Sequence, residues 1–264
     1  MTIDERKLFT QAHLNEYNEN GCVLIESAYP TEFADRARVE LKNAIDKEAE
    51  YHGGTDYKDY GMVLLCSLYG GVFIEAFDND VLIQGLNTIH GEGCIVYGYT
   101  SSSMPPDKSN FSKRIHVDSP RFITSDYFTN TGAMILVDDF TEDNGATWYL
   151  PGSHKKPEPP SEEYFQANAK RLIAKAGSIW FLNSRVWHAG GVNKTSEWRH
   201  SFTMNICKPW MKQRIDIPRA MAHMDLSGMS AAARQKLGFD AQVPASYDEF
   251  YAPPELRKYK QKAE

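Results

Sequence analysis

The sequence predicts a mainly antiparallel β protein, a barrel or a sandwich, with helices at both ends of the chain. The length of 264 residues fits one large domain, and no internal repeat or linker divides it. From residue 94 the chain changes to short β-rich runs separated by turns. We therefore expect a single domain over 1–264, with a helical N-terminal part over about 1–92, a β core over about 93–215 and a helical C-terminal extension over about 216–264.

The N-terminal part contains two helix patterns around one strand. Residues 4–18 place apolar side chains at helical spacing and stop at an Asn-Gly pair, and residues 22–28 read as a strand. Residues 30–54 repeat apolar residues once per helical turn and end at a glycine pair, which predicts a longer helix. Residues 60–90 are ambiguous: 62–77 are apolar enough to be core as a helix or as a strand, and 79–91 are weakly helical. In the C-terminal extension, residues 229–239 give the clearest helix pattern.

The β core is predicted from five runs rich in β-branched and aromatic residues, at 94–104, 126–140, 146–154, 177–191 and 197–211. A charged, proline-rich insertion at 154–170, with a short helix, interrupts them. Insertions of this kind often carry function, so we expect this one to overhang a site.

Composition and charge favour a small-molecule partner. The net charge is -6, and the basic residues are scattered, so the sequence shows no electrostatic surface for nucleic acid or an anionic membrane. The four cysteines are widely spaced without a C-x-x-C motif, which argues against a zinc knuckle and suits a reducing compartment. The N-terminus has no signal-peptide core, and no apolar run is long enough for a membrane helix. We expect a cytoplasmic protein; its oligomeric state is not indicated.

Three residues in β contexts are candidate metal ligands. His116 and Asp118 lie two residues apart in "KRIHVDSPRF", so in an extended chain their side chains point to the same side. Such a pair alone also occurs as surface decoration. His188 supplies a third ligand at a strand end before two glycines, which allow close approach of the chain. Arg199 follows eleven residues later, the length of a strand, a turn and a return strand, so it can face the same cavity.

Two histidines and one carboxylate leave half of an octahedron open, which is the ligand set of non-haem iron(II) oxygenases. In this chemistry 2-oxoglutarate and O2 take the open positions. The planar fork of Arg199 can hold the far carboxylate of 2-oxoglutarate, and Ser201, on the same strand face, can add a hydrogen bond. The sequence thus predicts Fe(II), 2-oxoglutarate and O2 as the cofactor and cosubstrates.

The motifs "IHVDSP", "DDFTEDNGATWYLPGSH", "VWHAGGVNKT" and "WRHSF" resemble the successive motifs of the phytanoyl-CoA dioxygenase-like branch of the iron(II)/2-oxoglutarate oxygenases. The resemblance reaches from the first helix to about residue 210. It implies a double-stranded β-helix, a cupin-like jelly roll, with flanking helices. It also implies His116, Asp118 and His188 as metal ligands, and the residues of the 2-oxoglutarate site: Arg199, Ser201 and Thr147.

Two positions bear on what the resemblance implies about the reaction. Relatives often carry a glutamine two residues before the first ligand, where this chain has Arg114. The long aliphatic CoA specificity of the namesake is therefore not carried over. Halogenating members have a small residue in place of Asp118, so its presence implies oxygen transfer or hydrogen abstraction.

Basic and aromatic residues near these motifs are the predicted substrate contacts, although strand aromatics also commonly belong to the core. They are Arg114, Arg121, Tyr97, Tyr99, Phe122, Trp148 and Trp187. We assign Trp180, Trp198 and Trp210 to packing. His154 is expected to make a structural hydrogen bond, and His200 to pack on the opposite strand face from Arg199.

The predicted function is oxidation of a small-molecule metabolite, of the kind met in secondary metabolism, coupled to decarboxylation of 2-oxoglutarate to succinate. Hydroxylation, desaturation, epoxidation, cyclisation and epimerisation all remain open. The alternatives are a cupin-type metal-dependent isomerase or hydrolase, and a noncatalytic ligand-binding barrel. Neither needs the dicarboxylate clamp formed by Arg199 and Ser201, which therefore disfavours both.

Overall fold

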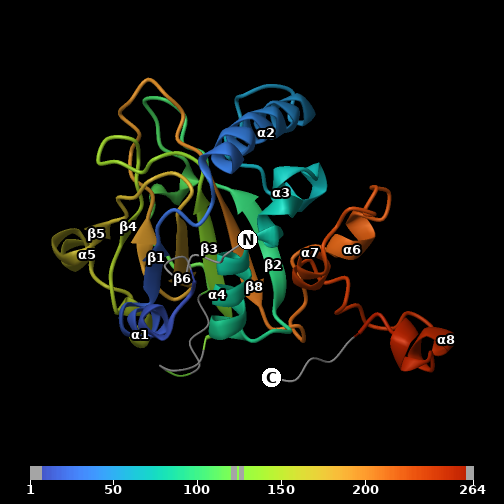
Figure 1. The fold of residues 1–264 in the computed structure, drawn as a ribbon. Helices are drawn as coiled ribbons and strands as arrows, with labels where there is room; N and C mark the ends of the chain where they lie inside the picture. The colour runs from blue at the N-terminus through green and yellow to red at the C-terminus, as the bar shows by residue number, and fades with distance from the viewer. Residues whose placement is uncertain (1–7, 120–123, 125–127, 260–264) are drawn as a thin grey trace.

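The structure is a computed structural model that describes residues 8–119, 124 and 128–259. Its centre is a five-stranded antiparallel sheet in the order β1-β6-β3-β8-β2 (Figure 1). These strands are β1 (Cys22–Ile25), β6 (Ile179–Asn183), β3 (Asn130–Leu136), β8 (Ser201–Cys207) and β2 (Ile95–Ser101). A second antiparallel sheet has the order β5-β4-β7, from β5 (Lys170–Arg171), β4 (Trp148–Tyr149) and β7 (His188–Ala189). The predicted mainly antiparallel β structure with flanking helices is confirmed.

Helices surround the sheets. Several of them lie within residues 60–90, where the sequence did not decide between helix and strand. The N-terminal ones are α1 (Gln11–Asn20), α2 (Thr31–Tyr51), η2 (Cys66–Tyr69), α3 (Val72–Glu75), η3 (Ala76–Asp78) and α4 (Asp80–His90). Between strands lie η4 (Phe111–Lys113), η5 (Ser153–Lys155) and α5 (Glu162–Asn168). The C-terminal ones are α6 (Ile217–Ala220), α7 (Ala231–Lys236), α8 (Tyr247–Phe250) and η6 (Pro254–Leu256). Within the described ranges, no helix combines the length and the apolar character needed to cross a membrane.

The first helix begins later than predicted. The expected start at residue 4 lies outside the described residues, and α1 starts at Gln11 because Thr10 caps it. The Thr10 side chain accepts a hydrogen bond from the His13 backbone N–H, and the His13 ring accepts one from the Thr10 N–H. This reciprocal pair is a capping box. The helix ends at Gly21, which has φ 76° and donates its N–H to Tyr17.

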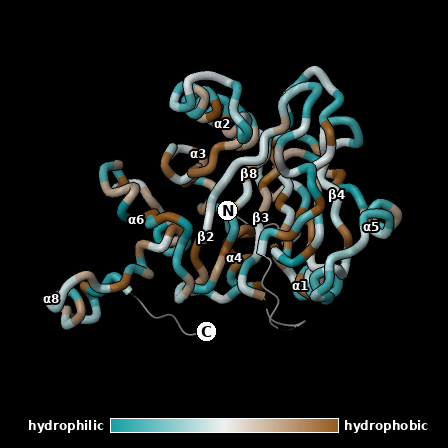
Figure 2. Tube along the Cα trace, turned by 180° about the vertical axis from the view of Figure 1, so that it is seen from behind, coloured by the Kyte–Doolittle hydropathy of each residue, from teal (hydrophilic) through white to brown (hydrophobic). Residues whose placement is uncertain are grey.

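The helix predicted at 30–54 forms as α2, with Phe33, Ala37, Leu41 and Ile45 buried on one face. From residue 66 to residue 90 the chain forms the short helices η2, α3 and η3 and then α4, which buries Val81, Leu82 and Leu86. In Figure 2 the more hydrophobic segments gather at the large sheet and α4, while α1 and α5 are mainly hydrophilic. One face of the five-stranded sheet is thus covered by the N-terminal helices.

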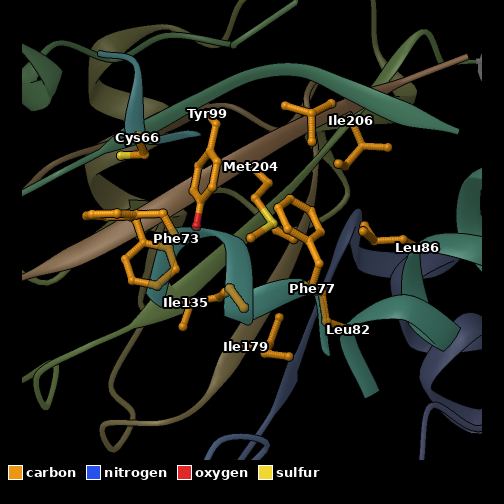
Figure 3. Close-up of a cluster of buried hydrophobic side chains, with 14 of the residues drawn as sticks. Cys66, Phe73, Phe77, Leu82, Leu86, Tyr99, Ile135, Ile179, Met204 and Ile206 are labelled. Atoms are coloured by element: carbon orange, nitrogen blue, oxygen red, sulfur yellow. The ribbon is translucent and has the colours of Figure 1, made fainter. Parts of the chain in front are cut away.

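Alternation along the strands decides which side chains reach the other face of this sheet. On β8, Phe202, Met204 and Ile206 are fully buried against the helices, whereas Thr203 and Asn205 are half-buried. Tyr99 of β2 lies on the helix side as well, among Phe73, Phe77 and Met204 (Figure 3). The prediction that Tyr99 contacts substrate is therefore wrong, because its side chain points into the core.

The prediction that the insertion at 154–170 overhangs the site is wrong. Its helix α5 packs on the outer side of the small sheet, where Phe165 lies against Leu150 and Ala189. None of the insertion's residues lines the cavity described below. The segment covers Leu150 and Ala189 through Phe165, and this packing is the role that the structure shows for it.

Candidate active site

A cavity of about 500 Å³ lies between the two sheets. Side chains that point away from the helices line its large-sheet wall, namely Met134, Trp180, Leu182, Thr203 and Asn205. His188, on β7, and Thr147, next to β4, line the wall on the side of the small sheet. Trp180 is buried, as expected of a packing residue, yet it also forms part of the wall. Its position two residues from Leu182 on one strand face is the signal that could have identified it.

His116, Asp118 and His188 come together at this cavity, as the sequence predicted. Their potential ligand atoms all lie within 4.8 Å of one another. His116 Nε2 lies 3.7 Å from Asp118 Oδ1, and His188 Nε2 lies 3.8 Å from the same oxygen. Ligand atoms about 2.1 Å from one metal ion lie about 3 to 4 Å apart, so the three side chains fit a divalent ion with little movement.

Backbone pairing holds the three residues in place. His116 and His188 exchange two backbone hydrogen bonds of 2.9 Å each, which brings a loop residue beside β7. One residue after Asp118, the Ser119 N–H donates to Ser184 at 3.0 Å. A side chain at Gly190 would collide with Ser112. The close approach predicted for the glycines after His188 is thus observed.

Both imidazoles are oriented by hydrogen bonds from the ring nitrogen that faces away from the triad. Nδ1 of His116 lies 2.8 Å from the carbonyl oxygen of Arg114, and Nδ1 of His188 lies 3.0 Å from that of Val186. A carbonyl only accepts, so each Nδ1 carries the hydrogen and each Nε2 keeps its lone pair. This arrangement is typical of metal-bound histidines.

The electrostatics of the site also favour neutral ligands. Burial, followed by the nearby His188, lowers the pKa of His116 to about 4. At neutral pH its imidazole is therefore uncharged and able to bind a cation. Two imidazole nitrogens and one carboxylate give a donor set suited to iron(II), zinc and related ions.

Arg199 lies fully buried beneath this cavity. Nη1 donates to the Ser102 carbonyl at 3.2 Å and to Ser201 Oγ at 3.1 Å, and Nη2 donates to the Gly145 carbonyl at 3.1 Å. Nε has no hydrogen-bond partner. The guanidinium lies 4.1 Å from the centre of the Phe140 ring. Burial lowers the pKa of Arg199 to about 9, although the charge of Asp138 opposes this.

The predicted cosubstrate residues lie in two layers. Thr147 lines the cavity, as does Ser102. Arg199 and Ser201 do not line it; both contact the Ser102 carbonyl from behind, and Ser201 Oγ donates to it at 3.1 Å. Ser102 thus both lines the cavity and contacts the buried guanidinium.

Of the predicted substrate contacts, Tyr97 and Arg114 line the cavity. Trp148 and Trp187 do not: both pack on the outer side of the small sheet near Phe165, and the Arg171 guanidinium lies 4.6 Å from the Trp148 ring centre. These two predictions are wrong, because the strand face directs both rings away from the metal ligands. Arg121 and Phe122 lie outside the described residues.

Three charged wall residues were missed. Lys58 and Asp59 come from the loop before η2, and Arg214 comes from the segment after β8. These segments carry no motif, so no sequence signal identified them. Asn205, in contrast, continues the alternation of Arg199 and Ser201 along one strand and was recognisable from that pattern.

The remaining histidine and tryptophan assignments can also be checked. His154 Nε2 lies 3.3 Å from the Asn18 carbonyl, and His200 Nδ1 lies 2.8 Å from Ser103 Oγ with its ring stacked on Trp198. Both histidines are buried and structural, as predicted. Trp210 is 62% exposed, so its assignment to packing is wrong.

Two antiparallel sheets that enclose a His-Asp-His triad define the class of cupin-like non-haem oxygenases. Solved structures agree on the fold. The apo form of the non-haem monooxygenase ThoJ matches with a TM-score of 0.63 and 18% identity, over 76% of this chain and 79% of ThoJ. SnoK, an α-ketoglutarate-dependent carbocyclase from nogalamycin biosynthesis, matches with a TM-score of 0.62 and 17% identity, over 77% and 86%.

Sequence comparison gives the family. The model of the phytanoyl-CoA dioxygenase (PhyH) family matches residues 17–201, and the chain belongs to this family. The uncharacterized protein Rv1501 of Mycobacterium tuberculosis is 29% identical over 230 residues, 85% of this chain and 82% of the relative. A phytanoyl-CoA dioxygenase of Arabidopsis thaliana is 28% identical over 123 residues, 38% and 43% of the two chains. The protein is an iron(II)/2-oxoglutarate-dependent dioxygenase, which confirms the predicted family and enzyme class.

Proposed function

We propose that this dioxygenase oxidises a small metabolite of secondary metabolism and converts 2-oxoglutarate to succinate. His116, Asp118 and His188 would hold the iron, which when bound supplies the activation of dioxygen. Hydroxylation is the simplest outcome, and desaturation, epoxidation, cyclisation and epimerisation would use the same site. The observation that carries the proposal is the metal triad at a cavity backed by a buried arginine, whose hydrogen-bond acceptors among the described residues are all neutral.

The state of Arg199 supports a dicarboxylate cosubstrate. Every hydrogen-bond acceptor that the structure gives its guanidinium is neutral, and Nε has none. A buried charge without an opposite charge is costly. The distal carboxylate of 2-oxoglutarate would supply that charge, and the planar guanidinium suits a two-point contact with it. We assign this carboxylate to Arg199, reached past Ser102.

The neighbouring hydroxyls support the same placement. Ser201 Oγ contacts Arg199 Nη1, and Thr147 is only 5% exposed but lines the cavity. Hydroxyl groups can donate to a carboxylate, and their burial keeps competing water out. We propose that Ser201 and Thr147 orient 2-oxoglutarate so that its 2-oxo-acid end meets the triad.

The test is the metal dependence of succinate formation. Metal-free protein is incubated with 2-oxoglutarate and one divalent ion at a time, and succinate is quantified. We expect succinate only with iron(II), and inhibition by zinc, nickel or cobalt, which bind such sites more tightly but lack the redox chemistry of iron. Full activity with zinc would instead indicate a metal-dependent isomerase or hydrolase. Metal binding without any turnover would indicate a ligand-binding barrel.

A further inference from the structure

The side chains on the cavity side of β8 mark two ends of the site. Its inward positions are Arg199, just before the strand, then Ser201, Thr203 and Asn205. At about 3.3 Å per residue, Arg199 and Asn205 are about 20 Å apart along the strand. The first two side chains are buried behind Ser102, whereas Thr203 and Asn205 line the open cavity. A cosubstrate bound at Arg199 therefore leaves the Asn205 end for another molecule.

Arg214 lies at this second end. Its backbone N–H donates to the Tyr97 carbonyl at 2.9 Å, which attaches the segment after β8 to β2. Asn205 pairs with Gly98 across the two strands, and the Arg214 stem lies beside Gly98, where Cδ is 3.8 Å from the position of a Cβ. Tyr97, Gly98, Asn205 and Arg214 all line the cavity. The backbone and stem of Arg214 are thus held at the Gly98 and Asn205 end of the cavity wall, away from Arg199.

The charges on the cavity wall are unlike those of the whole chain. The chain has a net charge of -6, yet three basic side chains line the cavity: Lys58, Arg114 and Arg214. Among the described residues, none of the three forms an ion pair. The wall carries two carboxylates, Asp59 and the metal ligand Asp118. Once Asp118 binds a cation, the basic groups outnumber the one remaining acid, which favours an anionic ligand.

The same end contains a buried polar atom without a partner. Asn205 Oδ1 is buried and makes no hydrogen bond with any of the described residues. An amide oxygen is a hydrogen-bond acceptor, so it suits a donor group of a ligand or a bridging water. An unpaired buried amide is costly unless a ligand or water binds it. Asn205 therefore indicates a polar ligand group beside Arg214.

The wall between the two ends is apolar. Met134, Trp180 and Leu182 line it, from neighbouring strands β3 and β6. Apolar side chains in a cavity bind the hydrophobic body of a ligand, while a few polar groups fix its orientation. The cavity wall is thus apolar in its middle and carries the basic side chain of Arg214 at one end.

We propose that the substrate is an acid with an apolar body, whose carboxylate or phosphate group binds Arg214, with Asn205 on the neighbouring strand. The apolar body then lies on Met134, Trp180 and Leu182, and the carbon to be oxidised lies near the triad. This inference rests on the proposed function, because it places the substrate relative to a cosubstrate at Arg199. Arg214 is then the residue that makes the site bind an anionic substrate more tightly than a neutral one.

The test compares matched acids and neutral analogues. The anaerobic complex with iron(II) and 2-oxoglutarate is titrated calorimetrically with 3-phenylpropionate and 3-phenylpropionamide, and separately with phenyl phosphate and phenol. We expect each preferred acid to bind about tenfold more tightly than its neutral partner, as for an arginine that holds an anion through two hydrogen bonds. The affinity difference within the carboxylate pair is then compared with that within the phosphate pair, which shows the acid group that the site prefers.

Variants then assign the preference to one side chain. Arg214→Gln should lower the acid affinity about tenfold and leave the amide affinity unchanged, and Arg214→Lys should lie between it and wild type. Lys58→Gln should have a smaller effect because Lys58 is exposed at the rim. The control is Arg219→Gln, since Arg219 is an exposed arginine nearby on α6 that does not line the cavity. Circular dichroism confirms that each variant is folded.

The outcomes separate this inference from the proposed function. Loading of 2-oxoglutarate is followed by its absorption band with iron, and Arg214→Gln should leave it unchanged. If that band never forms but acids still bind through Arg214, the proposed function is wrong and the anion site is real. Equal binding of acid and neutral partner, no binding by any acid, or unchanged acid affinity in Arg214→Gln would each overturn the inference.

Discussion

Asp118 is held differently from the two histidines of the triad. Each imidazole donates its Nδ1 hydrogen to a backbone carbonyl, whereas the structure gives the Asp118 carboxylate no hydrogen bond within the described chain. Its nearest polar contacts are the two imidazoles, at 3.7 and 3.8 Å. The carboxylate is thus available to a metal and contributes little to folding.

Asp118→Ala should abolish succinate formation and weaken iron binding, because loss of a charged first ligand costs more than the 10-fold to 100-fold typical of its supporting residues. The melting temperature of the metal-free protein should change little. Iron titration and thermal melting measure the two effects. Asp59→Ala, which removes the other cavity carboxylate, is the control and should keep iron affinity. Normal iron affinity in Asp118→Ala would exclude Asp118 from the metal site.

Arg199→Ala should remove most 2-oxoglutarate binding, at a cost of about 2 to 5 kcal/mol, because it leaves the distal carboxylate without its partner. Arg199→Lys keeps the charge but loses the planar fork, so its affinity should be intermediate. Iron binding should persist in both, since Arg199 is not a ligand. The readout is the absorption band of the anaerobic iron complex on addition of 2-oxoglutarate. Unchanged affinity in Arg199→Ala would refute the clamp.

At the level of elements, the close packing of α4 on the large sheet depends on one glycine. Gly85 on α4 faces the Phe181 ring of β6, and a Cβ at this position would come within 2.9 Å of ring carbon Cε1. Phe181 and Leu86 are fully buried in the same core. A glycine in a helix interior weakens the helix, so its use here reflects the close packing of α4 on β6.

Gly85→Ala tests this packing. Alanine favours the helix by about 1 kcal/mol, but overpacking a tight core costs about 1 to 3 kcal/mol. We expect net destabilisation of about 1 kcal/mol, measured by urea unfolding. Gly228→Ala is the control, because a Cβ at Gly228 meets nothing within 4 Å. A more stable Gly85→Ala protein would show that Phe181 can move and that the packing is loose.

For the whole molecule, buried imidazoles link stability to pH. His90 is 3% exposed and lies 3.2 Å from the Thr129 carbonyl. Burial, followed by the charge of Lys208, lowers its pKa from the usual 6.5 to about 4. Between these values the unfolded chain binds a proton that the folded chain does not. The free energy of unfolding therefore falls as the pH falls from 6.5 to 4.

The contribution of His90 should reach about 1.4 kcal/mol per pH unit within this window. His90→Gln keeps a hydrogen-bond donor toward Thr129 and removes the titrating group. Urea unfolding at several pH values should show a shallower loss of stability in His90→Gln than in wild type below pH 6.5, and parallel curves above it. Parallel curves throughout would mean that His90 does not titrate in this range.

Much of the site was predictable because its residues belong to local patterns. His116 and Asp118 share a strand face, and the glycines after His188 allow the approach that brings it beside them. The same alternation placed His200 away from Arg199. Motif spacing also indicated the family, which the family comparison confirmed.

The errors arose where sequence does not specify which face of a strand is inward. Tyr99, Trp148 and Trp187 lie close to motif residues in the chain, but their side chains point into the core or outward. Residues 60–90 were ambiguous because an apolar run fits a buried helix and a buried strand equally well. Residues 80–90 form a helix because the apolar face of α4 packs against β3 and β6.

By itself, the sequence determined the fold class, the metal triad and the arginine on β8, because these depend on strand alternation and on the chemistry of side chains within short segments. Only the tertiary structure decided that Arg214 lies beside Gly98, the strand partner of Asn205, and that Lys58 lines the same cavity, since these residues come from separate parts of the chain. It also decided that Arg199 is buried with only neutral hydrogen-bond acceptors among the described residues. Burial and charge balance depend on what the rest of the chain packs around a group, and no local pattern encodes that.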